Sequence, residues 1–265
     1  MPTPVEPAAE GRFTDVRRVA QTGSTNTDLL ELLRAGAPEG IVLVADHQTA
    51  GRGRLGRTWQ APAGSSLLVS VLLRPSLPPG GTHLVTVAAG LAAADAVEEV
   101  AGFRPGLKWP NDLVVEVDGG SRKLAGLLAE SVVDRGHVAG VVVGMGMNVR
   151  WPEPLPEDLA ATATTVSAVA GREIAPPDVL DAYLPALERR YATLGAEGGM
   201  TATARAHRTG CTTLGRQVVV EVGDGSFAGQ AVDVDEGGRL VVDLDGGGRR
   251  TVAVGDVVHL RPATT

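Results

Sequence analysis

Short apolar runs, each bounded by glycine, proline or aspartate, recur through the first half of the chain. The first clear run, IVLVADHQ, is rich in aliphatic and β-branched residues, which favour a strand in a segment this short. Similar runs return before residue 150. We therefore predict strands, joined in a mixed central sheet, over residues 41–48, 65–74, 106–117, 123–133 and 137–149.

Other segments carry apolar residues at the spacing of three and four that is typical of helices. Residues 83–100 are rich in alanine and predict a helix packed across the sheet. Residues 177–194 predict another helix, which we expect Pro185 to kink or divide because proline lacks the amide hydrogen of the helical ladder. Ahead of LLELLR, a hydroxyl or the amide of Asn26 can cap a shorter helix that ends near Arg34.

The pattern changes after Cys211, where short strand-like runs alternate with glycine-rich or aspartate-rich turns. A small β-barrel or sandwich of about fifty residues fits this pattern. We therefore predict an α+β protein with a flexible lead over 1–11, a large domain over 12–212 and a small β domain over 213–265.

Composition narrows the classes of protein that fit. The chain has 265 residues, of which 43% are hydrophobic, and a formal net charge of −7. An acidic chain is poorly suited to broad nucleic-acid binding, and the segment before Ser24 is too short for a winged helix-turn-helix, so we expect no DNA-binding head. The single cysteine, Cys211, forms no internal disulfide, and no apolar stretch has the length of a membrane span. We expect a cytoplasmic protein without a membrane partner.

The segment GRGRLGRTW at 51–59, called the arginine loop below, holds three arginines, three glycines and no acid. Glycine lets the backbone approach a ligand closely, and the arginine guanidinium offers a fork of donors that matches phosphate and carboxylate oxygens. The loop therefore predicts an anion site. Pro62 and Gly64 follow it where a dinucleotide-binding fold needs a helix, which argues against a Rossmann site.

Four further stretches combine polar side chains with glycine in ways that core packing does not require. They are STN at 24–26, KWPND at 108–112, KLAGLLAE at 123–130 and GMGMN at 144–148. With the HQTA segment and the arginine loop between the first two, these motifs resemble, in type and order, those of the biotin protein ligase family. The resemblance is to the form that lacks an N-terminal DNA-binding domain, and it covers about residues 15–262.

The resemblance implies a class II synthetase-like biotin/lipoyl ligase catalytic domain followed by a small SH3-like β-barrel. It also implies a two-step ligase reaction, in which biotin and ATP form biotinyl-5'-AMP and an acceptor lysine then takes the biotinyl group. Mg²⁺ would accompany ATP through phosphates and waters, so no protein metal ligand is assigned. The implied acceptor is a biotin carboxyl carrier domain of an acyl-CoA carboxylase, such as acetyl-CoA carboxylase, or of pyruvate carboxylase.

Residue roles follow from the same resemblance. Side chains that both donate and accept hydrogen bonds suit the ureido ring of biotin, and charged groups suit its carboxylate and the phosphates. The implied biotin-binding residues are Ser24, Thr25, Asn26, Gln48, Gly51, Arg52, Gly53, Arg54, Lys123 and Gly126. The implied adenylate-binding residues are Arg52, Arg54, Arg57, Trp59, Asn111, Lys123 and Asn148. The implied catalytic residues are Lys123, Arg54 and Asp112.

Two mechanistic hypotheses accompany these roles. Asp112 either removes a proton from the acceptor lysine or only orients its ammonium group, and orientation is the safer role because an aspartate is a weak base for that proton. Residues 50–56 are predicted to be mobile without ligand and ordered with it, since a closed loop would keep water from the adenylate.

Two competing functions share part of this pattern. A lipoate–protein ligase has a related catalytic fold and the same adenylate chemistry, but the pair GRGRLGRTW and KWPND speaks against it. A non-catalytic biotin-sensing protein would need neither Lys123 nor Asp112.

The oligomeric state is open. An edge strand of the central sheet either pairs with the same strand of a second copy or stays capped, so monomer and weak homodimer are both consistent with the sequence.

Overall fold

The computed structural model describes residues 11–78, 81–117, 120–151, 157–223, 225–253 and 256–259. Seven strands form a central sheet in the order β1-β2-β3-β7-β6-β5-β4. β1 and β2 pair in parallel and every other neighbouring pair is antiparallel, so the sheet is mixed, as predicted. The strands are β1 (Asp15–Thr22), β2 (Ile41–Gln48), β3 (Ser66–Leu73), β4 (Gly106–Lys108), β5 (Asp112–Val117), β6 (Gly120–Asp134) and β7 (His137–Asn148).

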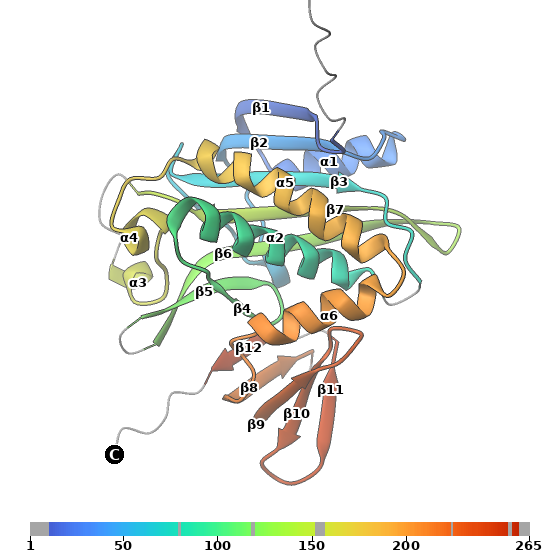
Figure 1. Ribbon diagram of the computed structural model, residues 1–265, viewed down its shortest axis with the longest axis vertical. Helices are drawn as coiled ribbons and strands as arrows, with labels where there is room; N and C mark the ends of the chain where they lie inside the picture. The colour runs from blue at the N-terminus through green and yellow to red at the C-terminus, as the bar shows by residue number, and fades with distance from the viewer. Residues whose placement is uncertain are drawn as a thin grey trace, which may run out of the picture.

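Helices cover both faces of this sheet (Figure 1). α2 (His83–Ala101) and α5 (Pro176–Gly195) lie side by side on one face, and their apolar residues join those of the sheet in the main core. α1 (Thr25–Arg34) packs on the opposite face, where its leucines meet apolar side chains of β2, β3 and β7. The other helical segments are η1 (Arg54–Gly56), α3 (Glu157–Ala160), α4 (Val166–Ala170) and α6 (Gly199–Gly210).

Strand alternation decides which side chains reach each face. Along β3 and β7 the odd-numbered residues face α2 and α5, whereas even-numbered ones face α1. Beside the first turn of α1, this face of the sheet carries Ser70, Gly144 and Gly146 in place of large aliphatic side chains. This part of the sheet is the floor of the candidate site.

A second sheet of five antiparallel strands follows, in the order β11-β10-β9-β8-β12 (Figure 1). Its core also takes in Trp109 from the turn between β4 and β5. The Trp109 indole nitrogen donates to the Gly238 carbonyl oxygen at 3.0 Å, and the Trp109 amide donates to Thr213 Oγ1 at 3.0 Å. One tryptophan therefore ties the KWPND segment to the C-terminal sheet. The strands of the C-terminal sheet are β8 (Gln217–Val222), β9 (Gly225–Val234), β10 (Leu240–Leu244), β11 (Arg249–Val252) and β12 (Asp256–His259).

The segment predicted as one strand over 106–117 is two strands. β4 ends at Lys108 and β5 begins at Asp112, with a turn between them. Pro110 has no amide hydrogen for a sheet ladder, and the side chain of Trp109 is buried in the C-terminal core. The correction matters because the turn brings the KWPND side chains to the rim of the candidate site.

α1 ends at Arg34 as predicted, but the predictions of a side-chain cap for α1 and of a division at Pro185 are corrected. Pro185 does not divide α5, which runs unbroken from Pro176 to Gly195 and packs against α2. Ser24 is the N-cap residue of α1, but no side chain caps the helix from that position. Instead, the Thr25 amide donates to Gln48 Oε1 at 2.8 Å, so β2 supplies the acceptor for the first turn.

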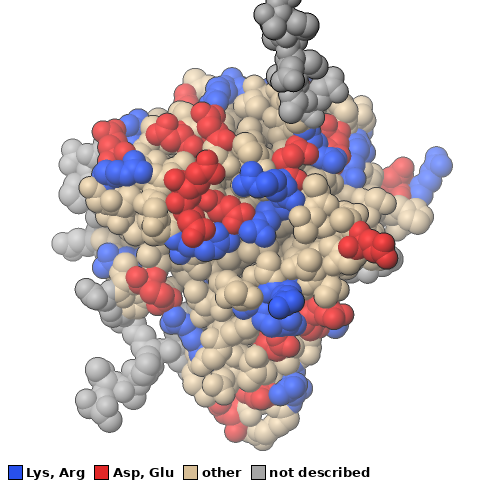
Figure 2. Space-filling view, viewed as in Figure 1, with Lys and Arg blue, Asp and Glu red and all other residues tan. Residues whose placement is uncertain are grey.

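Acidic and basic side chains are interleaved over the helical face of the molecule (Figure 2). Asp95 on α2, for example, lies 2.8 Å from Arg104 and 2.7 Å from Arg190. Within the described ranges, no helix combines the length and apolar character needed to cross a membrane. The predicted flexible lead falls outside the described residues, except for Gly11.

The role of Trp109 as the tie between the sheets is testable by substitution. Trp109→Phe should lower the free energy of unfolding by about 2–3 kcal/mol, because it removes bulk from a position only 2% exposed and leaves the Gly238 carbonyl without its donor. Urea denaturation measures this loss. Trp151→Phe is the matched control, because that indole N–H is buried without a hydrogen-bond partner among the described residues, and it should cost about 1 kcal/mol or less. Equal losses in the two variants would contradict the proposed tie.

Candidate active site

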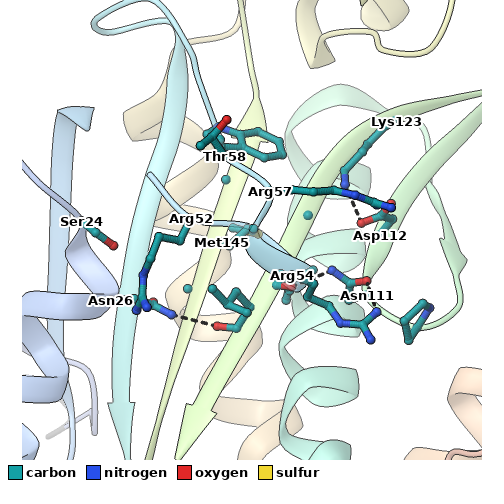
Figure 3. Close-up of a pocket in the computed structure, with 18 of the residues that line it drawn as sticks. Ser24, Asn26, Arg52, Arg54, Arg57, Thr58, Asn111, Asp112, Lys123 and Met145 are labelled. Carbon is teal, nitrogen blue, oxygen red and sulfur yellow. Dashed lines mark hydrogen bonds and ion pairs between the residues drawn. The ribbon is translucent and has the colours of Figure 1, made fainter. Parts of the chain in front are cut away.

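A cavity of about 280 Å³ lies on the α1 face of the central sheet (Figure 3). Its floor comes from β3, β6 and β7, and its walls come from the start of α1, the arginine loop and the turn at 108–112. Glu221 and Val257 of the C-terminal sheet complete the lining. Segments from the whole length of the chain therefore meet around one concave site, as is usual for binding pockets.

The structure brings most of the predicted site residues to this cavity. Gly51 and Asn148 are not among the lining residues. Gly51 closes the base of the arginine loop, where its carbonyl oxygen accepts from the Trp59 amide at 2.9 Å, and Asn148 is buried at the end of β7. The predicted residues that do line the cavity are Ser24, Thr25, Asn26, Gln48, Arg52, Gly53, Arg54, Arg57, Trp59, Asn111, Asp112, Lys123 and Gly126.

At one end of the cavity, an uncharged hydrogen-bond network joins α1, β2 and β3. Gln48 Oε1 accepts from the Thr25 amide and, at 3.1 Å, from the Thr25 hydroxyl. Ser70 Oγ lies 2.7 Å from both Thr25 Oγ1 and Asn26 Oδ1. Thr25, Asn26 and Ser70 are buried, so this end is lined by polar groups that are shielded from solvent.

Sequence reasoning missed Ser70 as part of the site. It is a hydroxyl within the otherwise aliphatic stretch LLVSVLL, and all of β3 is buried. A polar residue in the middle of a buried strand needs a hydrogen-bond partner, and that need is the signal that could have identified it.

The glycines of GMGMN make room for two neighbouring side chains on the cavity floor. A Cβ at Gly144 would overlap the Asn26 amide, and a Cβ at Gly146 would lie 2.5 Å from the Trp59 ring. The two glycines are two residues apart and so face the same side of β7. Their missing side chains let Asn26 and Trp59 lie directly on the strand backbone.

Lys123 and Asp112 lie at the other end of the cavity (Figure 3). Lys123 Nζ is 2.7 Å from Asp112 Oδ1 and 5.8 Å from the Trp59 ring centroid, within the range of a cation–π contact. The ammonium group is therefore held between a carboxylate and an aromatic ring.

A β-bulge aims Lys123 into the cavity. Leu124 is an extra residue between two register pairs of β5 and β6, and its side chain is fully buried in the main core. Lys123 and Gly126 are an odd number of residues apart and would face opposite sides of a regular strand, but both line the cavity. The Lys123 amide donates to the Thr162 carbonyl oxygen at 2.7 Å, which anchors the bulge.

Arg52 and Arg54 extend to different parts of the cavity. Arg54 Nη1 donates to Asn111 Oδ1 at 3.1 Å, and Asn111 Nδ2 donates to the Leu127 carbonyl oxygen at 2.8 Å. The Arg52 guanidinium instead lies near Asn26, with Nη2 2.5 Å from Glu130 Oε2 (Figure 3). Arg54 therefore lies at the charged part of the cavity, and Arg52 lies at the end where the uncharged network is found.

Positive charge dominates the lining. Five lining residues are basic and two are acidic, on a chain whose formal net charge is −7. This local excess suits an anionic ligand. Across the described residues, no group of three or more His, Cys, Asp or Glu side chains is arranged to hold a metal ion.

Cys211 and His207 lie outside this constellation. Burial raises the pKa of the Cys211 thiol, and hydrogen bonds involving Thr213 offset that rise only in part. Burial also lowers the pKa of His207 to about 4. Neither residue lines the cavity, and Cys211 belongs to the core of the C-terminal sheet.

Comparison with known proteins gives a consistent result. The Biotin/lipoate A/B protein ligase family matches residues 19–148, and the biotin protein ligase C terminal domain matches residues 213–260. The biotin–[acetyl-CoA-carboxylase] ligase of Mycobacterium tuberculosis is 40% identical over 252 residues, which cover 92% of this chain and 88% of that protein. The bifunctional ligase/repressor BirA of Bacillus subtilis is 33% identical over 225 residues, covering 84% of this chain and 68% of that protein.

Solved structures share the fold as well. The biotin protein ligase from Aquifex aeolicus in complex with biotin and ATP has a TM-score of 0.78 and 27% sequence identity, and the match covers 94% of this chain and 100% of that chain. The fold and the relatives both confirm the resemblance seen in the motifs. The chain therefore belongs to the biotin protein ligase family.

Proposed function

We propose that the protein is a biotin–protein ligase, which activates biotin with ATP to biotinyl-5'-AMP and transfers biotin to a lysine of a biotin carboxyl carrier domain. The observation that carries the proposal is the division of one cavity into an end where Thr25, Asn26 and Ser70 supply uncharged donors and acceptors beside the Arg52–Glu130 ion pair, and a charged end around Lys123. Biotin has the same division, with a neutral ureido ring and a carboxylate. The names of the relatives and the similar structure that holds biotin and ATP support the assignment.

In the first step, a carboxylate oxygen of biotin attacks the α-phosphorus of ATP and the bond to pyrophosphate breaks. Both reactants are anions, so fixed cations must offset their repulsion as charge builds at phosphorus. We assign this role to Arg54 and Lys123, within the positive field of Arg57 and Lys108. ATP enters as its Mg²⁺ complex, with the ion held mainly by phosphates and waters.

The adenylate contacts are assigned to Trp59, Asn111 and Asn148. Trp59 suits the purine because its ring lies over Gly146 and next to the Lys123 ammonium, at the charged end of the cavity. Asn111 accepts a hydrogen bond from Arg54. Its side chain can therefore contact a polar edge of the adenylate while it holds the guanidinium that faces the phosphate. Asn148 lies on the same face of β7 as Gly146 but just outside the lining.

In the second step, the acceptor amine attacks the carbonyl carbon of biotinyl-5'-AMP, the bond to the AMP oxygen breaks, and the proton of the amine passes to solvent or to the departing AMP. Asp112 already forms an ion pair with Lys123. A carboxylate neutralised in this way is better suited to hold Lys123 and orient an incoming ammonium than to remove a proton. We assign Asp112 the orienting role.

We further propose that residues 12–212 are the catalytic domain and that 213–265 form a small β domain that completes the site. Glu221 and Val257 extend the cavity wall, and Trp109 links the catalytic turn to this domain. The acceptor is a carrier domain of an acyl-CoA carboxylase, such as acetyl-CoA carboxylase, or of pyruvate carboxylase. We place the enzyme in the cytoplasm, as a monomer or weak homodimer that uses no DNA or membrane partner.

The proposed activity is tested by isotope exchange. With biotin, MgATP and labelled pyrophosphate, the purified chain should form labelled ATP, and mass spectrometry should detect biotinyl-5'-AMP. Lipoate should give no exchange, because it lacks a ureido group to pair with the buried polar side chains around Thr25, Asn26 and Ser70. Exchange with lipoate alone would identify a lipoate ligase, and biotin binding without exchange would identify a sensor.

The charge-offsetting role of Lys123 predicts a large kinetic effect. Lys123→Ala should slow single-turnover formation of biotinyl-5'-AMP about 100- to 1000-fold, because a fixed cation is lost where negative charge develops. Arg122→Ala removes a neighbouring cation on β6 that does not line the cavity, and it should change the rate by about twofold at most. Similar slowing in both variants would contradict the assignment.

Because the Trp59 ring lies directly on the backbone at Gly146, a side chain at position 146 should change nucleotide binding selectively. In Gly146→Ala the new methyl group, 2.5 Å from the Trp59 ring, should displace the indole and raise KM for ATP about tenfold, while KM for biotin changes about twofold at most. Steady-state kinetics measures both constants. Gly225→Ala, on β9 with open space for a methyl group, is the control. An unchanged KM for ATP would remove Trp59 from the adenylate contacts.

A further inference from the structure

The arginine loop is a short hairpin that carries its own backbone bonds. Arg52 bridges to Thr58 across the hairpin, and the Gly53 amide donates to the Arg57 carbonyl oxygen at 2.7 Å. Leu55 at its tip is 68% exposed. These bonds give the hairpin a shape but do not join it to the cavity floor. Side chains must make that connection.

The Arg52 side chain makes such a connection through Glu130 on β6. Arg52 Nη2 lies 2.5 Å from Glu130 Oε2, and this carboxylate is only 25% exposed, compared with 44% for the Arg52 side chain. The ion pair is therefore partly exposed, and its carboxylate is the more shielded of the two groups. It links the first turn of the loop to a strand of the sheet.

Glu130 also sets the orientation of Asn26 in the uncharged network. Glu130 Oε2 accepts from Asn26 Nδ2 at 2.9 Å, and the same nitrogen donates to the Leu128 carbonyl oxygen at 3.1 Å. The two hydrogens of the Asn26 amide are thereby matched with two acceptors. Asn26 Oδ1 is left to face Ser70 Oγ, from which the network continues to Thr25 and Gln48.

We infer that Glu130 is a positioning residue that couples docking of the arginine loop to the order of the biotin-recognising network. One carboxylate oxygen serves both Arg52 and Asn26, so loss of its charge releases the loop and loosens the amide together. Arg52 then acts through its side chain as the anchor of the loop, while Arg54 remains at the charged part of the cavity. The inference rests on the proposed function, because it takes biotin as the ligand of the network.

Coupling has a direct thermodynamic consequence. Biotin bound in the ordered network should stabilise the docked loop, and the docked loop should strengthen biotin binding by the same factor. ATP binding, which uses the other end of the cavity, should depend much less on Glu130.

The experiment compares Glu130→Gln with the wild-type chain. The substitution keeps the size of the side chain and removes its charge, so Kd for biotin should rise about tenfold while KM for ATP changes about twofold at most. Hydrogen exchange of residues 50–57 at saturating biotin should be faster in the variant. The difference in biotin affinity should narrow at about 1 M salt, where the screening length is about 3 Å. Loss of packing alone would not depend on salt in this way.

A double-mutant cycle isolates the pair. Arg52→Gln should weaken biotin binding in the wild-type background and have little further effect in the Glu130→Gln background, because the interaction is already lost. Glu116→Gln is the matched control, since Glu116 pairs with Arg216 at 2.6 Å on neighbouring β5 without lining the cavity, and it should leave Kd for biotin unchanged. An unchanged Kd in Glu130→Gln, or additive effects in the cycle, would overturn the inference. A wild-type chain that fails to exchange pyrophosphate with biotin would instead overturn the proposed function.

Discussion

The candidate site depends on the absence of side chains at two positions in the middle of β7. This strand lies between β3 and β6 in the central sheet, and its ladder bonds hold its backbone in place. At Gly144 and Gly146 that backbone is directly exposed to Asn26 and Trp59, which come from α1 and from the arginine loop. Any side chain at these positions would fill the floor and push both segments outward. The cavity exists because a rigid strand is bare where two separate segments must rest on it.

The polarity of the cavity follows from which elements border it. β2, β3 and α1 supply uncharged donors and acceptors, whereas β5, β6 and the loop supply the charged groups. Elsewhere in the described structure many basic side chains face acids, as Arg190 does with Asp95 and Arg216 with Glu116. At the cavity Lys123 is paired as well, with Asp112, but five of the lining residues are basic and two are acidic although the chain as a whole is acidic. An anion would be drawn to this site rather than to the molecular surface in general.

The sequence predicted the long apolar elements well because burial imposes a clear period on them. β2 begins and ends where its apolar run does, and α2 follows the alanine-rich segment to within one residue. β1 escaped prediction because an edge strand buries few side chains, and α6 because threonine and glycine break its apolar stripe.

The sequence motifs also located most of the residues that line the cavity. They could not show the bulge at Leu124, because register between distant strands decides which residue is extra. The Arg52–Glu130 pair spans 78 positions and was equally invisible.

The turn between β4 and β5 lies where the two sheets meet, and contacts with both sheets hold it in place. Pro110 has no amide hydrogen, so the turn at 109–111 bulges out between the paired residues Lys108 and Asp112, and its position depends on contacts made by its neighbours. Trp109 supplies one anchor in the core of the C-terminal sheet, and the bond from Asn111 to the Leu127 carbonyl supplies another on β6. Between these anchors, Asp112 is held against Lys123. Through Trp109 the C-terminal sheet holds one side of this turn, and it also adds Glu221 and Val257 to the lining of the cavity.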